Sequence, residues 1–458
     1  MTTGHVAVID IGKTNAKLAL VDSRSMTEVS VITRPNTVLP GPPWPHFDVD
    51  GHWAFLLDGL SQFNRDHGIS AISVTTHGAS GVLLDANGDL AAPVLDYEHT
   101  GPDQTAAAYD AIRPAFEETG APRLPMGLNL GAQLFWMFDT DPGLAARTHR
   151  VMTYPQYWGF RLTGVAASDV SSLGCHTDLW APYDRSYSSL VGHLGLSGKM
   201  AAARRSFDVL GPILPDLAAR TGLAGDLPVY CGIHDSNASL LPHILGREAP
   251  FSVVSTGTWV IVMSMGGRDV ALDPDRDTLV NVNALGDPVP SARFMGGREF
   301  ETVIAGQFGT PEPGDIARVL ETPIILCPAV VPGCGPFPNR TASWIGGEPP
   351  LGSGARTVAV SFYLALMTAK CLDLIGRRGP VVVEGPFSGN LEYRQMLCAA
   401  TGCPVISARG ATGTSIGAAM LAGARPTHWP DEADATLRHA PDDMQAYSRR
   451  WAAATAGP

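Results

Sequence analysis

Two similar strand–turn–strand segments, one at the start of the chain and one roughly halfway along it, constrain the fold most. The first runs from Val6 to Val21 and the second from Phe251 to Ser264. In each, apolar and β-branched runs flank a polar turn that contains glycine, which is typical of a β-hairpin. Two hairpins of one kind predict a duplicated architecture, in which two similar domains face each other and hold a ligand between them.

The turn of the first hairpin carries groups that suit a nucleotide. Gly12 allows the backbone to approach phosphate groups closely. Side chains that donate hydrogen bonds to phosphate follow it at Lys13, Thr14, Asn15 and Lys17. Asp10 is the acid of this segment, and it fits the set if Mg²⁺ lies between the carboxylate and the phosphate oxygens. A plain hairpin with a solvated, charged tip is the alternative.

A single carboxylate stands where an apolar strand is expected to break and a helix to begin. The strand from Val229 breaks at Gly232, and Asp235 opens the helix. Partial positive charge at a helix start favours the ionised form of Asp235 and leaves its oxygens free to accept a proton. Asp235 is therefore a candidate general base, although an ordinary N-cap aspartate explains the local sequence at least as well.

Composition sets outer bounds on the class of protein. A chain of 458 residues exceeds what one hydrophobic core usually serves, so two or three domains are expected. The formal net charge of −12 argues against nucleic acid or an anionic membrane as the main partner, while a local cationic pocket for ATP remains allowed. The apolar stretch from Val358 to Ala369 is too short to span a bilayer.

Targeting and cysteine usage favour the cytoplasm. The first residues, Met1 to Val6, lack the basic start of a secretion signal. Seven cysteines occur without a Cys-x-x-Cys pair, so a zinc site or a disulfide framework is not expected. Packing residues in a reducing compartment explain most of them.

Alternating strand and helix patterns predict α/β layers. Besides the hairpins, strands are expected at Ala71–Thr76 and Gly81–Leu84, and helices at Trp53–Phe63 and Gly131–Phe138. From Val358 onward, apolar residues recur at helical spacing and predict a helix that packs on the sheet of the second domain.

The order of these segments resembles the FGGY family of carbohydrate kinases, which belongs to the actin-like, ribonuclease-H-like ATPase superfamily. The similarity runs from Val6 to about Gly423. It implies an α/β fold with two ribonuclease-H-like domains flanking a deep cleft. Residues 1–243 would form the N-terminal domain, residues 244–424 the C-terminal domain, and residues 425–458 a tail without a recognisable motif.

In the second domain the resemblance implies further contacts to ATP. They fall on Thr256, Gly257 and Thr258 of the second hairpin, and on Gly385, Gly389 and Asn390 of a segment similar to the adenosine-binding loop. The family often has Gly-Gly-Gly or Gly-Gly-Ala in this loop, whereas this chain has Glu384-Gly385-Pro386-Phe387. Residues Gly413 to Gly423 are similar to the small-residue helix that closes the second domain.

Contacts to a sugar are implied in the first domain. They are His77, Gly78, Asp96, Gln156, His234 and Asp235. The residue after the catalytic aspartate is frequently Asn or Gln in the family, but here it is Ser236. The pair His234–Asp235 and the turn Gly257-Thr-Trp259 look like the branch that acts on 6-deoxyketoses such as rhamnulose and fuculose.

The resemblance implies phosphoryl transfer from ATP to a small ketose. Asp235 would accept the proton of a primary hydroxyl group as that oxygen attacks the γ-phosphorus, and Mg²⁺ near Asp10 would offset the phosphate charge. The expected substrate is a 6-deoxyketohexose or a ketopentose, such as fuculose, rhamnulose, ribulose or xylulose. The expected setting is the cytoplasm, without nucleic acid or membrane, and a homodimer is left open. A sugar-binding regulator of the same fold and a phosphoanhydride hydrolase are the alternatives.

Overall fold

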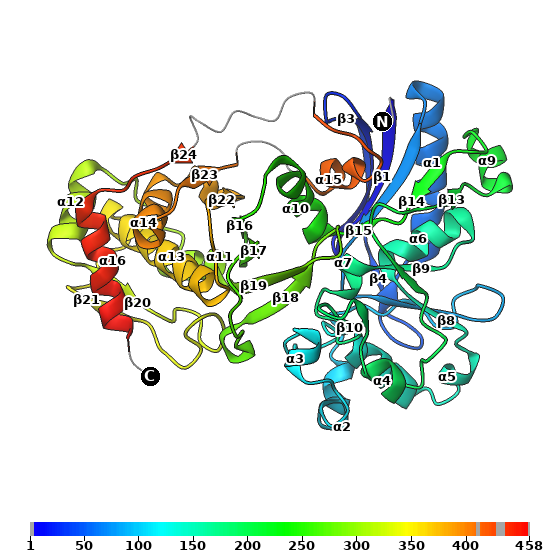
Figure 1. Ribbon diagram of the computed structural model, residues 1–458, viewed down its shortest axis with the longest axis horizontal. Coiled ribbons are helices and arrows are strands. Elements are labelled where there is room, and N and C mark those ends of the chain that lie inside the picture. Colours follow the sequence, from blue (N-terminus) through cyan, green and yellow to red (C-terminus); the bar gives the residue numbers. More distant parts are fainter. Residues whose placement is uncertain (1–3, 409–412, 427–435, 457–458) are drawn as a thin grey trace. The chain divides into compact units, whose positions relative to one another are not determined.

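The protein, seen here as a computed structural model, divides into two compact units (Figure 1). Unit 1 comprises Met1–Gly246, Val280–Pro288 and Ala411–Trp429; unit 2 comprises Arg247–Leu279, Val289–Gly410 and Pro430–Pro458. The structure describes residues 4–408, 413–426 and 436–456. Residues 1–3, at the start of the chain, lie outside these ranges. Residues 427–435 of the expected tail lie outside them as well.

A mixed sheet forms the centre of unit 1. Its strand order is β13–β14–β6–β1–β2–β3, and β15 also pairs with β6. The strands are β1 (His5–Ile11), β2 (Asn15–Asp22), β3 (Thr27–Pro35), β6 (Ala71–Thr76), β13 (Val209–Pro212), β14 (Pro228–Tyr230) and β15 (Ile233–His234). Strands β1 and β2 are antiparallel neighbours, which confirms the first hairpin, while β6 runs parallel to β1, β14 and β15.

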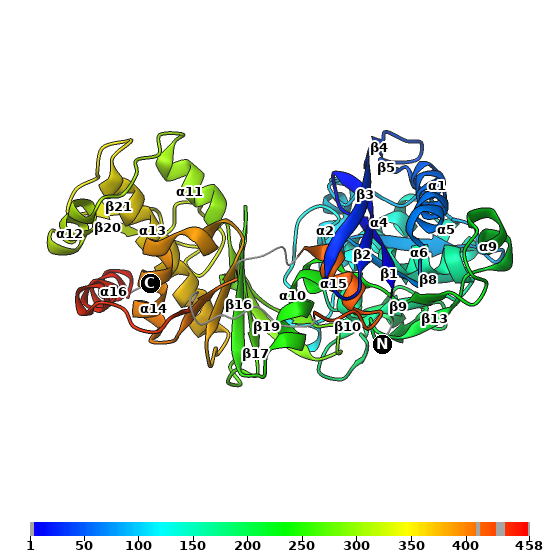
Figure 2. The same cartoon turned by 90° about the horizontal axis from the view of Figure 1, so that it is seen from above.

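Helices cover both faces of this sheet because the strand β1 is apolar on both sides. Ala7, Ile9 and Ile11 pack with α1 (Val49–His67) on one face, whereas Val6 and Val8 pack with α10 (Asp235–Gly246) and α15 (Thr414–Met420) on the other. Side chains of a strand alternate between the two faces of its sheet, so two separate cores result. Figure 2 shows α1 and α15 on opposite sides of β1–β3.

Smaller elements of unit 1 surround the sheet. Strands β7 (Gly81–Leu84) and β8 (Arg150–Thr153) pair antiparallel, and α6 (Tyr154–Thr163) packs beneath β6 and β14. The others are β4 (Val38–Leu39), β5 (His46–Phe47), η1 (Gly101–Thr105), α2 (Ala106–Asp110), α3 (Phe116–Thr119), α4 (Leu130–Thr140), α5 (Leu144–Arg147), β9 (Ala167–Asp169), α7 (Val170–Leu173), β10 (Trp180–Ala181), β11 (Ser186–Tyr187), α8 (Leu190–His193), β12 (Ala202–Arg204) and α9 (Pro215–Thr221). The strands and helices expected at residues 53–63, 71–76, 81–84 and 131–138 are thereby confirmed.

Unit 2 is built around a second sheet of order β18–β19–β17–β16–β22–β23–β24. The antiparallel pair β16 (Phe251–Thr256) and β17 (Val260–Met265) confirms the second hairpin. The remaining strands are β18 (Thr278–Val282), which crosses the boundary between the units, β19 (Pro288–Phe294), β22 (Val381–Glu384), β23 (Val405–Ser407) and β24 (Thr436–Leu437). A separate strand pair joins β20 (Ile325–Cys327) to β21 (Ser343–Ile345).

The helices of unit 2 pack around α13 (Gly354–Leu374), which contacts β17, α11 (Gly296–Ile304), α12 (Pro313–Glu321) and α14 (Leu391–Thr401). The predicted helix at Val358–Ala369 is therefore confirmed, but it is longer than expected. Its 21 residues are long and apolar enough to cross a bilayer, which corrects the sequence argument from length, yet 83% of its most apolar window is buried inside the protein. Such burial is typical of a core helix.

Two expectations about the C-terminal part of the chain require correction. The small-residue helix α15, which was assigned to the second domain, lies in unit 1 against α10, β1 and β6. Gly417 lets the two helices approach closely, since a Cβ atom at this position would lie 1.7 Å from the carbonyl oxygen of Ala238. The expected tail is part of unit 2, because α16 (Asp442–Thr455) packs on α14 and buries Tyr447 and Trp451.

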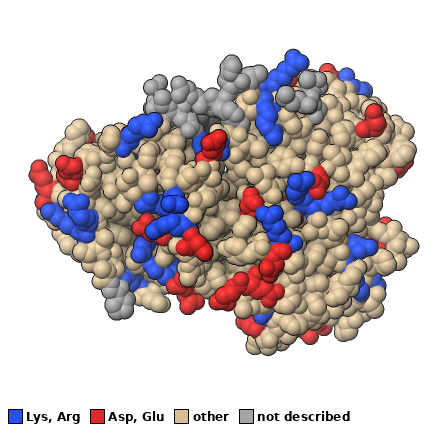
Figure 3. Space-filling view, viewed as in Figure 1, with Lys and Arg blue, Asp and Glu red and all other residues tan. Residues whose placement is uncertain are grey.

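Charged side chains are mixed on the surface. On the face drawn in Figure 3, lysine and arginine lie among aspartate and glutamate rather than in one basic field. This agrees with the scattered basic residues of the sequence and its net charge of −12.

The contact between α10 and α15 predicts that Gly417→Ala destabilises unit 1. The added methyl group would overlap the backbone of Ala238, and overpacking of this kind costs about 1–3 kcal/mol. Thermal unfolding of the purified variant should show a lower midpoint. Gly192→Ala in α8 is the matched control, because its Cβ atom would meet no atom within 4 Å and alanine favours a helix. Equal midpoints for Gly417→Ala and the parent protein would contradict the contact.

Candidate functional site

Three parallel strands of unit 1 end at the same edge of the sheet and bring the candidate residues together. Ile11 of β1 pairs with Thr76 of β6, and Thr76 in turn pairs with His234 of β15. Side chains at or just beyond these strand ends therefore become neighbours. In open α/β sheets ligands bind at the carboxyl ends of parallel strands, where the strand order reverses.

Asp235 is the first residue of α10, directly after β15. The chain turns into this position through Gly232, whose φ of +89° and whose approach to the carbonyl oxygen of Val74 exclude a side chain. The Asp235 carboxylate accepts a hydrogen bond from the backbone N–H of Ser236 at 2.6 Å, and its side chain is 31% exposed. Partial burial raises the pKa of Asp235, while the charge of His234 and the bond from Ser236 act against this. The group is thus an accessible carboxylate of increased basicity.

His234 lies beside this carboxylate. Its Nε2 atom is 3.1 Å from Asp235 Oδ1 and 3.8 Å from the Sγ atom of Cys175. Burial alone would lower the pKa of His234, but the negative charges of Cys175 and Asp235 outweigh burial and raise it to about 9. Gly78 has no side chain because a Cβ atom there would lie 2.5 Å from the His234 ring. His234 and Gly78 therefore shape the surroundings of Asp235 by packing against each other.

His77 sits in a box of aromatic rings formed by Phe47, Tyr97 and Tyr154, with ring centroids 5.0–5.1 Å away. Burial, together with the nearby charges of His234 and Lys13, lowers the pKa of His77 to about 3, so the ring is neutral. Neither of its nitrogens has a hydrogen-bond partner among the described residues. Buried polar atoms without partners are uncommon, and here they point to a ligand.

Lys13 faces the same box rather than the hairpin tip. Its ammonium group forms ion pairs with Asp96 and with Glu98, the latter at 3.0 Å, and lies 4.7 Å from the centre of the Tyr97 ring. Lys13 was expected to contact phosphate and Asp96 to contact the sugar. In the structure the two side chains form an ion pair, so Lys13 is here the cationic partner of Asp96.

Asp10 and Lys17 are cross-strand partners in the first hairpin, and their side chains lie 3.2 Å apart. Thr414 and Ser415, at the start of α15, donate hydrogen bonds to the same Oδ2 atom of Asp10. Lys17 also contacts Glu28 at 3.3 Å. Lys17 is therefore paired with two carboxylates of the protein, whereas the tip residues Thr14 and Asn15 are exposed.

The donor set suits a cation that is shared with phosphate groups. No cluster of three or more His, Cys, Asp or Glu side chains that could hold a metal ion occurs within residues 4–408, 413–426 and 436–456. Asp10 supplies one buried carboxylate, and Mg²⁺ is commonly held by one or two carboxylates plus the phosphates of a substrate. The residues present thus fit Mg²⁺ bound together with a nucleotide.

Gln156, a predicted sugar contact, forms hydrogen bonds within the protein. It is fully buried, its amide donates to the carbonyl oxygen of Cys231 at 2.9 Å, and its Oε1 atom accepts from Thr153. These bonds hold its amide between α6 and the turn that precedes β15, and the expected sugar contact stays a prediction.

Gln133 is a polar residue of the site that sequence reasoning passed over in favour of Gln156. Its amide donates to the carbonyl oxygens of Ala79, at 2.6 Å, and Gly127, while its buried Oε1 atom has no partner among the described residues. Both glutamines are polar residues within apolar helices, so the local sequence offered no signal that separates them. Proximity to the loop that follows His77 distinguishes Gln133.

Unit 2 contains a pocket of about 630 Å³, within the range of small-molecule sites. It lies between the second hairpin, α11, α13 and the loop that precedes α14. Its lining comprises Gly257, Thr258, Gly297, Phe300, Glu301, Phe308, Pro311, Thr357, Pro386, Phe387, Gly389, Asn390, Leu391 and Glu392. Most of this surface is apolar, which suits a flat heterocyclic ring, and the expected residues Gly257, Thr258, Gly389 and Asn390 line it.

Three of the predicted ATP contacts form hydrogen bonds or close backbone contacts that hold the walls of this pocket together: Thr256, Gly385 and Asn390. The Thr256 hydroxyl donates to the carbonyl oxygen of Glu384 at 2.5 Å and accepts from the N–H of Phe387 at 3.1 Å. Gly385 has a φ of +78°, and a Cβ atom there would lie 2.0 Å from the carbonyl oxygen of Thr256. Asn390 caps α14 and donates to Ser361. Thr256 and Gly385 therefore hold the hairpin against the loop and are not among the lining residues.

Comparison with known proteins places the chain in a family. Residues 5–242 match the N-terminal domain of the FGGY family of carbohydrate kinases, and residues 248–431 match the carbohydrate kinase FGGY C-terminal domain. Among curated proteins, the L-fuculokinase of Escherichia coli strain K12 is 27% identical over 279 residues, which cover 56% of each protein. The xylulose kinase of the same strain is 23% identical over 264 residues, covering 56% of this chain and 53% of that protein. The chain thus spans a little over half the length of the curated relatives it matches.

Solved structures agree over nearly the full length. A carbohydrate kinase from Novosphingobium aromaticivorans is 36% identical, with a TM-score of 0.90 and coverage of 98% of this chain and 100% of that one. The xylulose kinase from Rhodospirillum rubrum, at 20% identity, has a TM-score of 0.74 over 98% of both chains and shares the fold. The expected two-domain, ribonuclease-H-like fold of the actin-like ATPases is confirmed, and the chain belongs to the FGGY family of carbohydrate kinases.

Proposed function

We propose that this protein transfers the γ-phosphoryl group of ATP to a primary hydroxyl group of a small ketose, with Asp235 as the general base. The observation that carries the proposal is the position of Asp235, an accessible carboxylate at the strand edge that also presents the first hairpin and His77. A base at such an edge reaches a bound hydroxyl group, and phosphoryl transfer requires mainly positioning and charge neutralisation.

The sugar is held by unit 1 in this proposal. The two unpaired nitrogens of His77 offer one donor and one acceptor to sugar hydroxyl groups, and the Oε1 atom of Gln133 offers an acceptor. The ion pair between Lys13 and Asp96 closes the aromatic box on one side. A buried polar group that is paired only when the substrate is bound discriminates strongly against analogues that lack the matching hydroxyl group.

In this proposal the pocket of unit 2 takes the adenine ring, and the glycine-bearing tip of each hairpin contacts phosphate groups. Phe300, Phe387 and Leu391 provide apolar walls for the adenine ring. Asp10 would hold Mg²⁺ jointly with the phosphate groups, and the cation would neutralise part of their charge. Exposed donors at the first tip are Thr14 and Asn15.

The names of the similar curated proteins support a narrower proposal for the substrate. L-fuculokinases and xylulose kinases recur among the similar curated proteins. We therefore propose a 6-deoxyketohexose or a ketopentose as substrate. A cytoplasmic location and a homodimer stay predictions.

ADP release with Mg²⁺ATP tests the function against a panel of fuculose, rhamnulose, ribulose, xylulose, erythrulose and glycerol, with a blank that contains no sugar. Strong stimulation by one sugar is the expected result. Equal release with and without every sugar would identify a hydrolase, and sugar binding without release would identify a regulator.

Asp235→Asn should lower kcat by about 10²-fold or more, because the amide cannot accept the proton of the attacking hydroxyl group. The affinity for ATP should stay within a few-fold of the parent value. Steady-state kinetics with the best sugar, together with calorimetric titration of MgADP, measure both quantities. Turnover near that of the parent protein would exclude Asp235 as the base.

His234→Gln should move the acid limb of the pH profile to higher pH. The charge of His234 lowers the pKa of Asp235, so its removal raises that pKa further. A carboxylate base loses activity as the pH falls through its pKa, and the variant should therefore lose kcat/KM at a higher pH than the parent. Superimposable profiles would show that Asp235 is not the titrating group.

Gly389→Leu should weaken ATP binding without affecting the sugar. A Cβ atom at Gly389 meets no atom of the described residues within 4 Å, so a leucine side chain has room beside the pocket that Gly389 lines, and we expect it to take space from the nucleotide. We expect the KM for ATP to rise about tenfold or more and the KM for the sugar to stay within twofold. Gly314→Leu in α12 is the control, since that glycine also has open space but does not line the pocket. Equal KM values for ATP in the two variants would remove the nucleotide from this pocket.

A further inference from the structure

The tip of the first hairpin is anchored by a buried asparagine that lies outside the hairpin. Asn36 directly follows β3, and only 6% of it is exposed. Its side-chain amide donates to the carbonyl oxygen of Gly12 at 2.8 Å, and its backbone N–H donates to the carbonyl oxygen of Thr14 at 2.9 Å. One residue therefore holds the peptide groups on both sides of Lys13 and Thr14.

His52 fixes the orientation of the Asn36 amide. The His52 ring is fully buried on α1, and its Nε2 atom lies 2.7 Å from Asn36 Oδ1. Its Nδ1 atom lies 2.8 Å from the guanidinium group of Arg34, which can only donate. The proton of the neutral ring is therefore on Nε2 and points to Asn36 Oδ1. Burial and the charge of Arg34 lower the pKa of His52 to about 4, which keeps the ring neutral.

Arg34 is itself held in place by Asp48. The Asp48 carboxylate pairs with the Arg34 guanidinium group and caps α1 by accepting from the N–H of Gly51 at 3.0 Å. Gly51 has no room for a side chain, because its Cβ atom would lie 2.1 Å from Asp48 Oδ2 and 2.4 Å from Arg34 Nη2. A continuous hydrogen-bonded series thus runs from the start of α1 to the tip.

This series of hydrogen bonds fixes the orientation of the peptide groups at the hairpin tip. In a trans peptide the C=O and N–H groups lie on opposite sides. Because Asn36 binds the carbonyl oxygens of Gly12 and Thr14, the N–H groups of the next residues, Lys13 and Asn15, point away from Asn36. Oriented backbone N–H groups of this kind form concave anion sites.

We propose that Asn36, oriented by His52, is a positioning residue that sets the phosphate-binding geometry of the hairpin tip. The proposal rests on the proposed function, in which this tip contacts the phosphate groups of ATP. Asn36 does not touch the nucleotide; it acts through the peptide groups of Gly12 and Thr14. In the part of the chain that the structure describes, Asn36 has no hydrogen bond to the residues around His77, and it is linked to that site through the backbone of Lys13, so we expect a smaller effect on the sugar than on the nucleotide.

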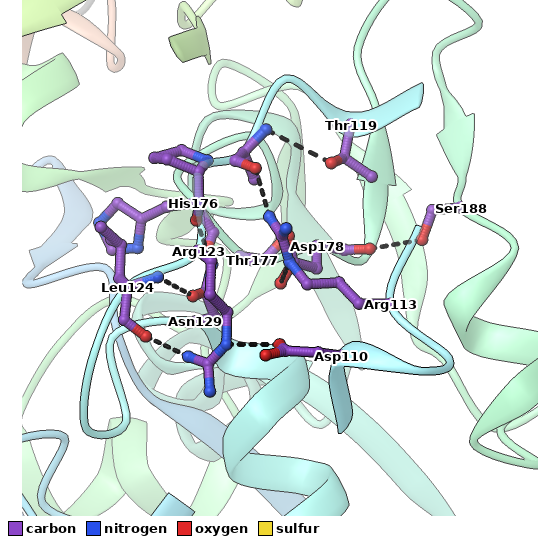
Figure 4. A network of polar contacts seen from close by, with 12 residues as sticks. Asp110, Arg113, Thr119, Arg123, Leu124, Asn129, His176, Thr177, Asp178 and Ser188 are labelled. Carbon is purple, nitrogen blue, oxygen red and sulfur yellow. Dashed lines mark hydrogen bonds and ion pairs between the residues drawn. The ribbon is translucent and has the colours of Figure 1, made fainter. Parts of the chain in front are cut away.

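Asn36→Asp tests this with minimal change of shape. The carboxylate can still accept from His52, but it cannot donate to the carbonyl oxygen of Gly12 and repels it. The matched control is Asn129→Asp in unit 1, another fully buried asparagine whose amide donates to the carbonyl oxygens of Pro122 and His176, both at 3.0 Å (Figure 4). The ion pair between Arg113 and Asp178 belongs to the same group of polar contacts (Figure 4).

Three measurements separate positioning from general loss of structure. They are amide hydrogen exchange of residues 11–16 in the ligand-free protein, calorimetric titration with MgADP, and the KM values for ATP and for the best sugar. For Asn36→Asp we expect exchange at the tip to accelerate about tenfold, the Kd for MgADP and the KM for ATP to rise about tenfold, and the KM for the sugar to rise by a clearly smaller factor. Asn129→Asp should change none of these nucleotide parameters.

A second pair of variants tests the orientation by His52 if Asn36→Asp does not fold. His52→Gln retains an N–H donor for Asn36, whereas His52→Phe does not, so nucleotide affinity should be closer to the parent value in the glutamine variant. Unchanged tip exchange and MgADP affinity in Asn36→Asp, or equal affinities in the two His52 variants, would overturn the proposal. If the parent protein phosphorylates no sugar, the proposed function fails, while the exchange and MgADP measurements still decide the role of Asn36.

Discussion

The parallel pairing of β6 with both β1 and β15 is the constraint on which the site depends. Thr76 pairs with Ile11 on one side and with His234 on the other, so three distant segments end at one level. The hairpin, the loop after β6 and the start of α10 then have a common edge. A register shift of one residue would turn every side chain of β15 to the opposite face and would remove Asp235 from this edge.

Around this edge the charge of each ionisable side chain is determined by the groups next to it. Half-exposed Asp235 keeps a basic carboxylate beside His234, whose charge is supported by two anionic neighbours. His77 lies only a short distance away but is enclosed by aromatic rings and remains neutral. His234 is therefore charged because it has anionic neighbours. His77 is neutral because the charged groups that affect its pKa are all cationic.

Local patterns predicted the hairpins, the break at Gly232 and the position of Asp235, because each is determined by residues a few positions apart. Pairings across long sequence distances were not predictable in this way. Lys13 meets Asp96 through the folding of an entire layer, and the choice between Gln133 and Gln156 depends on which helix approaches the loop after β6. Helix α15 was expected in the second domain but packs in unit 1, because its small residues indicate close packing but not the partner.

The return of α15 to unit 1 has a consequence for biosynthesis. Unit 1 is left open when the chain passes into unit 2 after α10, and the segment that covers Ala238 and binds Asp10 follows most of unit 2 in the sequence. A chain that is made from its N-terminus can therefore not complete its first unit until nearly all of the second has left the ribosome. Until then the part of β1 and β6 that α15 covers is exposed in the nascent protein, and exposed apolar surface of this kind favours aggregation.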